Sequence, residues 1–317
     1  MAKVLTTDSL IESIKRRALI PTNQSTFTTA DFIDLLNEEI DTGLIPYLLR
    51  IHEEHLVTYH DEPLENDVRR YSIPYRSIGN KLRDASFIDL AGNVYELSRI
   101  SLEQVSDFQG SYTTTRRNVF YIESDEIVLP NELVNNEGYL RMHYYLRPNT
   151  LVQEDEVGII SAINTTTGEI TLSSIPTDFS SLPDMDFVCK RSPGKILSFD
   201  KTPVSVNSNT KVVTFATTDL PSGLVVGDYL CKAEETIIPQ VPVELHPILA
   251  QRVAVQCLEA LGDSEGLANA RAKLERMEQN VLSSIDDRVD GAQQKILNRN
   301  GVLRDAVSRA SSRRRKF

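Results

Sequence analysis

The chain has 317 residues and a formal net charge of -11, with 45 acidic residues against 34 lysines and arginines. Its longest apolar runs are far shorter than the roughly 20 residues needed to cross a bilayer. The first residues, MAKVLTTDSL, lack the apolar segment of a secretion signal, and Cys189, Cys231 and Cys257 are too few for a disulfide framework. The composition therefore predicts an ordinary globular protein, made in a cytoplasm and without a membrane segment.

The first part of the chain, residues 1–65, has the apolar spacing of helices. Pro21 stops the first helix, and Gly43 and Pro46 should break or kink the second. The capping candidates are Thr7 or Asp8 for the first helix and Thr28 or Thr29 for the second. We expect the two helices to form an antiparallel pair.

From residue 66 the apolar period changes to two, which is typical of strands. The stretches RRYSIPYRSIG, SFIDLAGNVYELSRIS, NVFYIESDEIVLP and GYLRMHYYLRPN are short and are separated by Gly, Pro and Asn. AGN at 91–93 and NNEG at 135–138 are predicted hairpin turns. A β-rich domain is expected over 66–157.

A repeat follows, in a predicted insert domain at 158–240. EITLSSIPTDFSSLPDMDFVCK (169–190) aligns without gaps with KVVTFATTDLPSGLVVGDYLCK (211–232), at an offset of 42 residues. Two copies of one small strand unit predict a sandwich or barrel built by duplication. Asp186 and Asp228 fall on equivalent positions, where we expect them to fix a turn rather than to bind a ligand.

Helical spacing returns over 241–297. Gly262 can end one helix, and Asp263 or Ser264 can cap the next, which carries a narrow apolar stripe. The predicted fold class is therefore α+β: a helical bundle formed by the N- and C-terminal helices, with an inserted β-rich region that contains the duplicated small β unit.

The sequence contains no strong catalytic or ligand-binding motif. His52, His55 and His60 lie close together, and HEEH is compatible with a metal, but nothing nearby completes a ligand set; a solvated helix face is the simpler interpretation. Signatures of nucleophilic catalysis and of nucleotide-binding loops are missing from the sequence. We expect no enzymatic activity, no metal and no cofactor.

The last segment, 298–317, is strongly basic and ends in an aromatic residue. It can be an arm that docks on a partner, a contact to DNA, or a terminus that only keeps the protein soluble. The candidate partner-binding residues are Arg304, Arg309, Arg313, Arg314, Arg315, Lys316 and Phe317.

Three stretches carry a family resemblance: YSIPYRSIGNKLRD, NVFYIESDEIVLP and above all GYLRMHYYLRPNTLV. They resemble the head-to-tail adaptors, or connectors, of tailed bacteriophages, which sit beneath the portal. The repeat style G-x-I-x-x-I-N…T-G-E-I-T-L is also similar to the β insert of these proteins. The resemblance covers residues 5–190, and the C-terminal helices by pattern only.

The resemblance implies a virion protein in the neck, at the head–tail interface, that forms a homo-oligomeric ring of about a dozen subunits. Its implied partners are the portal protein, a tail or neck protein below and, transiently, packaged DNA. The basic arm would dock on the portal. Three alternatives stay open: a tail-completion or neck ring further from the portal, a nucleic-acid-binding protein that acts through the basic arm, and an enzyme whose activity depends on the His52, His55 and His60 group.

Overall fold

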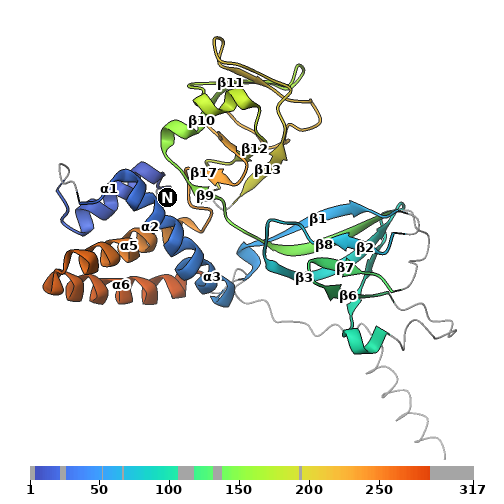
Figure 1. Cartoon of the computed structure of the whole chain (residues 1–317), viewed down its shortest axis with the longest axis horizontal. Coiled ribbons are helices and arrows are strands. Elements are labelled where there is room, and N and C mark those ends of the chain that lie inside the picture. The colour runs from blue at the N-terminus through green and yellow to red at the C-terminus, as the bar shows by residue number, and fades with distance from the viewer. Residues whose placement is uncertain are drawn as a thin grey trace, which may run out of the picture.

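The computed structural model describes residues 4–21, 26–51, 53–65, 68–105, 118–130, 138–192 and 195–285. Helices from both ends of the chain lie together on one side, and two β-rich bodies extend from them (Figure 1). No helix within these ranges is both long enough and apolar enough to span a membrane.

The helices begin and end where short-range chemistry dictates. Thr28 and Asp31 form a reciprocal capping box at the start of α2, and Gly262, in the left-handed conformation, ends α5. Both boundaries agree with the sequence prediction. The helices are α1 (Thr7–Arg17), α2 (Thr29–Glu39), α3 (Ile45–Ile51), α5 (His246–Leu261) and α6 (Ser264–Ile285).

The predicted break or kink at Gly43 and Pro46 takes the form of a wide helical turn that interrupts the α-helix. A π-helix (η1, Ile40–Leu44) joins α2 to α3. A side-chain carbon at position 43 would collide with the Glu39 carboxylate and the Arg252 guanidinium. Glycine therefore leaves room for the ion pair between Glu39 Oε1 and Arg252 Nη1, which are 2.8 Å apart.

Helices from the two ends share one apolar core. α5 contacts α1, α2 and α6, and ten of its sixteen residues are buried. This core contains, among others, Leu10, Ile14, Phe32, Leu36, Leu48, Ile248, Leu249 and Val253.

The first β-rich body consists of two four-stranded sheets (Figure 1). One has the order β1-β8-β3-β4 and the other β2-β7-β6-β5. Phe87, Leu140 and Met142 from the first sheet and Tyr71 and Ile127 from the second belong to one buried cluster. The strands are β1 (Val57–Pro63), β2 (Arg70–Ser72), β3 (Ser77–Asp89), β4 (Val94–Glu96), β5 (Ser98–Arg99), β6 (Val119–Glu123), β7 (Glu126–Val128) and β8 (Gly138–Leu146).

The second β-rich body is built on a seven-stranded sheet of order β13-β12-β16-β10-β11-β15-β14. Its own core includes Phe179, Phe187 and Phe215. The strands are β10 (Gly158–Asn164), β11 (Glu169–Leu172), β12 (Met185–Val188), β13 (Ile196–Lys201), β14 (Ser205–Asn207), β15 (Val212–Thr214) and β16 (Tyr229–Lys232).

The pairing in this sheet follows the 42-residue repeat. Phe187 lies opposite Leu230, and Val188 lies opposite Tyr229. In the repeat, Phe187 is equivalent to Tyr229, and Val188 is equivalent to Leu230. Exchanging each residue for its equivalent therefore turns one pair into the other, so the two copies are related by a local two-fold axis. The β11–β15 pair has the same property, and the equivalent strands β10 and β13 flank the β12–β16 pair on either side.

Short elements connect these bodies. The parallel pair of β9 (Thr150–Leu151) and β17 (Glu235–Thr236) joins the chain entering the second β-rich body to the chain leaving it. The 3-10 turns are η2 (Glu53–His55), η3 (Leu102–Gln104), η4 (Glu154–Glu156), η5 (Thr177–Ser181) and η6 (Val243–Leu245).

The predicted fold class, a helical bundle with an inserted β-rich region, is wrong. The described chain is mostly β-rich, with four sheets, one of them seven-stranded, and its helices are few and confined to segments near the ends. The physical reason is that each β-rich body closes a hydrophobic core of its own. These two cores are distinct from the helical core, which takes in only a few sheet residues such as Tyr145 of β8.

We expect Gly168→Ala to destabilise the second β-rich body. Gly168 has a φ of +75°, and an added side-chain carbon would collide with the carbonyl oxygen of Phe215, which belongs to the other copy of the repeat. Gly79 has a φ of +57° and open space around it, so Gly79→Ala is the matched control for backbone strain alone. The collision should add about 1–3 kcal/mol to the loss, measured by urea unfolding; equal losses in both variants would contradict this contact.

Candidate functional site

The most heavily bonded buried polar cluster of the described residues lies where the two β-rich bodies meet. Its centre is Arg76, in the tight turn between β2 and β3, where the Ser77 amide donates to the Pro74 carbonyl at 2.8 Å. The turn points the arginine at β12 and β13 of the other body. Only 2% of Arg76 is exposed, which is rare for arginine unless it is paired.

Asp186 on β12 is the partner of Arg76. Nη1 and Nη2 of Arg76 donate to the two carboxylate oxygens at 2.7 and 3.0 Å, the bidentate geometry that suits guanidinium and carboxylate. Asn149 Nδ2 donates to the same carboxylate at 2.6 Å, and the backbone amides of Asp200 and Glu234 donate at 3.0 and 3.2 Å. The Asp186 carboxylate is thus fully surrounded by donors and has no exposed surface.

Arg76 makes further hydrogen bonds and a contact with an aromatic ring. Its Nη2 donates to Asp200 Oδ1 at 2.5 Å, and its Nε donates to the Tyr75 hydroxyl at 3.1 Å. The Tyr75 hydroxyl in turn donates to Asp200 at 2.7 Å. The guanidinium also lies over the Phe199 ring, 5.1 Å from its centre. We call Arg76, Asn149, Asp186 and Asp200 the junction.

The electrostatics of the junction favour the charged form of Arg76. Burial alone would lower the pKa of Arg76, but the hydrogen bonds and the charge of Asp186 hold that pKa above its ordinary value. Burial also raises the pKa of the neighbouring Tyr144 to about 12, so its hydroxyl stays protonated. The arginine is therefore a fixed cation whose donors are all directed at protein groups, which suits a structural role better than chemistry on a substrate.

The two equivalent aspartates of the repeat have different roles. The Asp228 carboxylate accepts from the amides of Val225 and Lys190 at 2.9 and 3.0 Å, so it fixes a turn, as predicted. The same prediction is wrong for Asp186, which lies within a strand and holds Arg76. The difference arises because Arg76 of the first β-rich body reaches only one of the two copies.

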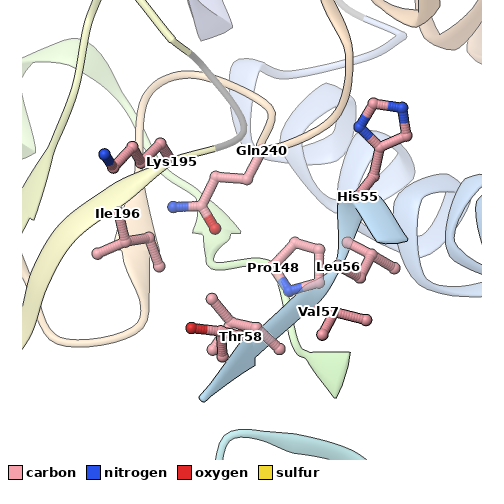
Figure 2. Close-up of a pocket in the computed structure, with 9 residues that line it drawn as sticks. His55, Leu56, Val57, Thr58, Pro148, Lys195, Ile196 and Gln240 are labelled. Carbon is pink, nitrogen blue, oxygen red and sulfur yellow. The ribbon is translucent and has the colours of Figure 1, made fainter. Parts of the chain in front are cut away.

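A cavity of about 240 Å³ lies beside the junction. Its wall includes Gln240, whose Oε1 accepts from the Asn149 amide at 2.8 Å. Figure 2 shows residues from η2, β1 and β13 around it. A second cavity, of about 340 Å³, opens in the first β-rich body near Arg83, Arg99 and Phe120.

The residues singled out by sequence do not form one site. Arg304, Arg309, Arg313, Arg314, Arg315, Lys316 and Phe317 lie outside the described residues, and so does His52. His55 lies in η2, and His60 lies on β1, where its Nε2 is 2.9 Å from Glu62 Oε2. Within the described ranges, no group of three or more His, Cys, Asp or Glu side chains is placed to hold a metal.

The junction was not predicted from the sequence, because its members are far apart in the chain. Arg76 and Asp186 are separated by 110 residues. One signal was present: Asp186 interrupts the apolar run MDFVC, in a strand whose other residues are buried. A charge at such a position needs a buried partner, although the sequence does not say which residue provides it.

No protein-family model matches the chain, and neither does any curated protein.

We predict that Arg76→Ala lowers the free energy of unfolding by about 3–5 kcal/mol, because it leaves the buried Asp186 charge without its cation. Arg70→Ala is the control: Arg70 also bonds two carboxylates, Glu123 and Glu126 at 2.7 and 2.9 Å, but on the surface. Because solvent screens exposed pairs, that variant should unfold close to the wild-type midpoint. Equal midpoints for the two variants in urea would show that the junction adds no stability.

A second prediction concerns Glu235, next to the junction on β17. Burial raises its pKa, and its Oε2 has no hydrogen-bond partner among the described groups. A carboxyl whose pKa is raised by folding contributes stability below its ordinary pKa, and that stability is lost as the pH rises through the raised value. The thermal midpoint of Glu235→Gln, relative to wild type, should therefore rise between pH 4 and pH 7. The exposed Glu265→Gln is the control; a flat difference for Glu235→Gln would contradict the burial effect.

Proposed function

We propose that this chain is a structural subunit of a phage neck: a head-to-tail adaptor that forms a ring beneath the portal and surrounds the DNA channel. The proposal starts from the three stretches that resemble such adaptors. They correspond to β2–β3, β6–β7 and β8–β9, which are neighbouring parts of the first β-rich body and the chain leaving it. Two of the four junction residues, Arg76 and Asn149, come from these stretches.

The observation that carries the proposal is the junction itself. Two β-rich bodies with separate hydrophobic cores are joined by a buried arginine whose donors are occupied by protein groups. An assembly subunit needs this property, because its binding surfaces must be held at fixed positions relative to one another to close a ring. A buried charged cluster specifies one arrangement through its bonds, whereas an apolar contact tolerates sliding.

The basic arm fits the same proposal. The chain as a whole is acidic, and seven basic side chains lie between Arg299 and Lys316. Arginine forks bind carboxylates of a partner surface, while an acidic body does not hold DNA through long-lived contacts. In this proposal the arm docks on the portal and the body lets DNA pass.

The proposal predicts that gradient-purified phage particles contain this chain at about a dozen copies, close to the portal's own count. Quantitative mass spectrometry of particles from the source culture measures this. A chain truncated after Asn298 should lose portal binding while duplex DNA binding stays weak in both forms. If the chain is absent from particles yet abundant in the lysate, the adaptor proposal fails; strong DNA binding that the truncation abolishes would favour the nucleic-acid-binding alternative.

A further inference from the structure

The 240 Å³ cavity beside the junction has the features of a binding site for a small molecule. It lies where the chain passes between the helices and both β-rich bodies, a position typical of ligand pockets. Five of its nine lining residues are apolar, namely Leu56, Val57, Leu146, Pro148 and Ile196, and the other four are polar. A cavity of about 150 Å³ lined by apolar side chains binds benzene, so this one is large enough for an aromatic ring with a short substituent.

One polar group in the wall has an unmet hydrogen bond. Gln240 is 95% buried, and its Nε2 has no partner among the described residues. The orientation of the amide is fixed, because Oε1 must face the Asn149 N–H that donates to it at 2.8 Å. Nε2 therefore points the other way. In Figure 2 it is turned toward Lys195 and Ile196 of the cavity wall.

The ammonium group of Lys195 lies on the same side of the cavity as the Gln240 amide (Figure 2). Lys195 lines the same cavity and is exposed, and no ion pair holds it among the described side chains. Figure 2 shows Lys195 and the Gln240 amide on the same side of the cavity, with Pro148 and Thr58 below them. An N–H donor and an ammonium close to five apolar side chains match a molecule with a carboxylate at one end and an apolar body.

We propose that the cavity binds small carboxylates with an apolar or aromatic body. The carboxylate accepts from Gln240 Nε2 and pairs with Lys195 Nζ, and the apolar part lies against Leu56, Leu146 and Ile196. Because the Gln240 amide also bonds Asn149 of the junction, such a ligand would bind next to the contact that joins the two β-rich bodies. This inference does not depend on the proposed adaptor function.

The test uses the full chain and 3-phenylpropionate as the probe, followed by isothermal titration calorimetry. We expect saturable binding at one site, with a Kd on the order of 1 mM or tighter for a ligand of this size. The alcohol 3-phenylpropanol has the same ring without the carboxylate and should bind at least tenfold more weakly. No saturable binding of the carboxylate, or equal binding of the alcohol, would overturn the proposal.

Two variants locate the site. Gln240→Glu keeps an oxygen for the Asn149 amide but replaces the free donor by a second oxygen, so the Kd for 3-phenylpropionate should rise at least tenfold. Lys195→Met removes the charge from an exposed side chain without touching the core and should raise the Kd several-fold. Lys273→Met, on the exposed face of α6, is the control and should bind like wild type. Unchanged affinity in Lys195→Met would overturn the proposal even if Gln240→Glu failed to fold.

Discussion

The structure depends on one buried carboxylate. A charge without exposed surface is tolerated only when its lone pairs are fully bonded, and the Asp186 carboxylate accepts five hydrogen bonds. The donors come from the β2–β3 turn, the segment after β8, strand β13 and the residue before β17. These segments belong to different parts of the fold. All five hydrogen bonds to the carboxylate can therefore form in only one relative arrangement of the two β-rich bodies.

This constraint also explains why the equivalent aspartates of the two repeat copies make different contacts. Pairing across β12–β16 and β11–β15 keeps the local two-fold relation of the copies. At the equivalent aspartates the relation is lost: the Asp228 carboxylate accepts from backbone amides of the repeat itself, whereas Asp186 also binds a cation from another body. Both copies keep the sheet together, but only one of them is tied to the first β-rich body. Gln240 extends this tie to the cavity wall through Asn149.

Helix caps, turns and the repeat were predictable from the sequence, whereas the relative contribution of helices and sheets to the fold was not. Thr28, Gly262 and the turn at 91–93 act through neighbours in the chain, and the repeat is visible in the letters alone. The predicted fold class was wrong because the helical spacing at both ends of the chain suggested that a helical bundle was the main part of the protein. The hydrophobic cores of the sheets are formed by residues far apart in sequence, so their extent was not visible in the sequence. The junction was missed for the same reason, and the predicted domain limits at 65/66, 157/158 and 240/241 stay predictions.

The central claim is that the junction fixes the two β-rich bodies relative to each other. Electron–electron double resonance between spin labels at Val94→Cys and Val204→Cys, two exposed positions in different bodies, measures this directly. Cys189 is changed to Ser, because it is the partly exposed one of the three free cysteines. The account predicts one narrow distance distribution with Arg76 present and a broad one in Arg76→Ala. Equally narrow distributions in both chains would show that something other than the junction holds the bodies in place.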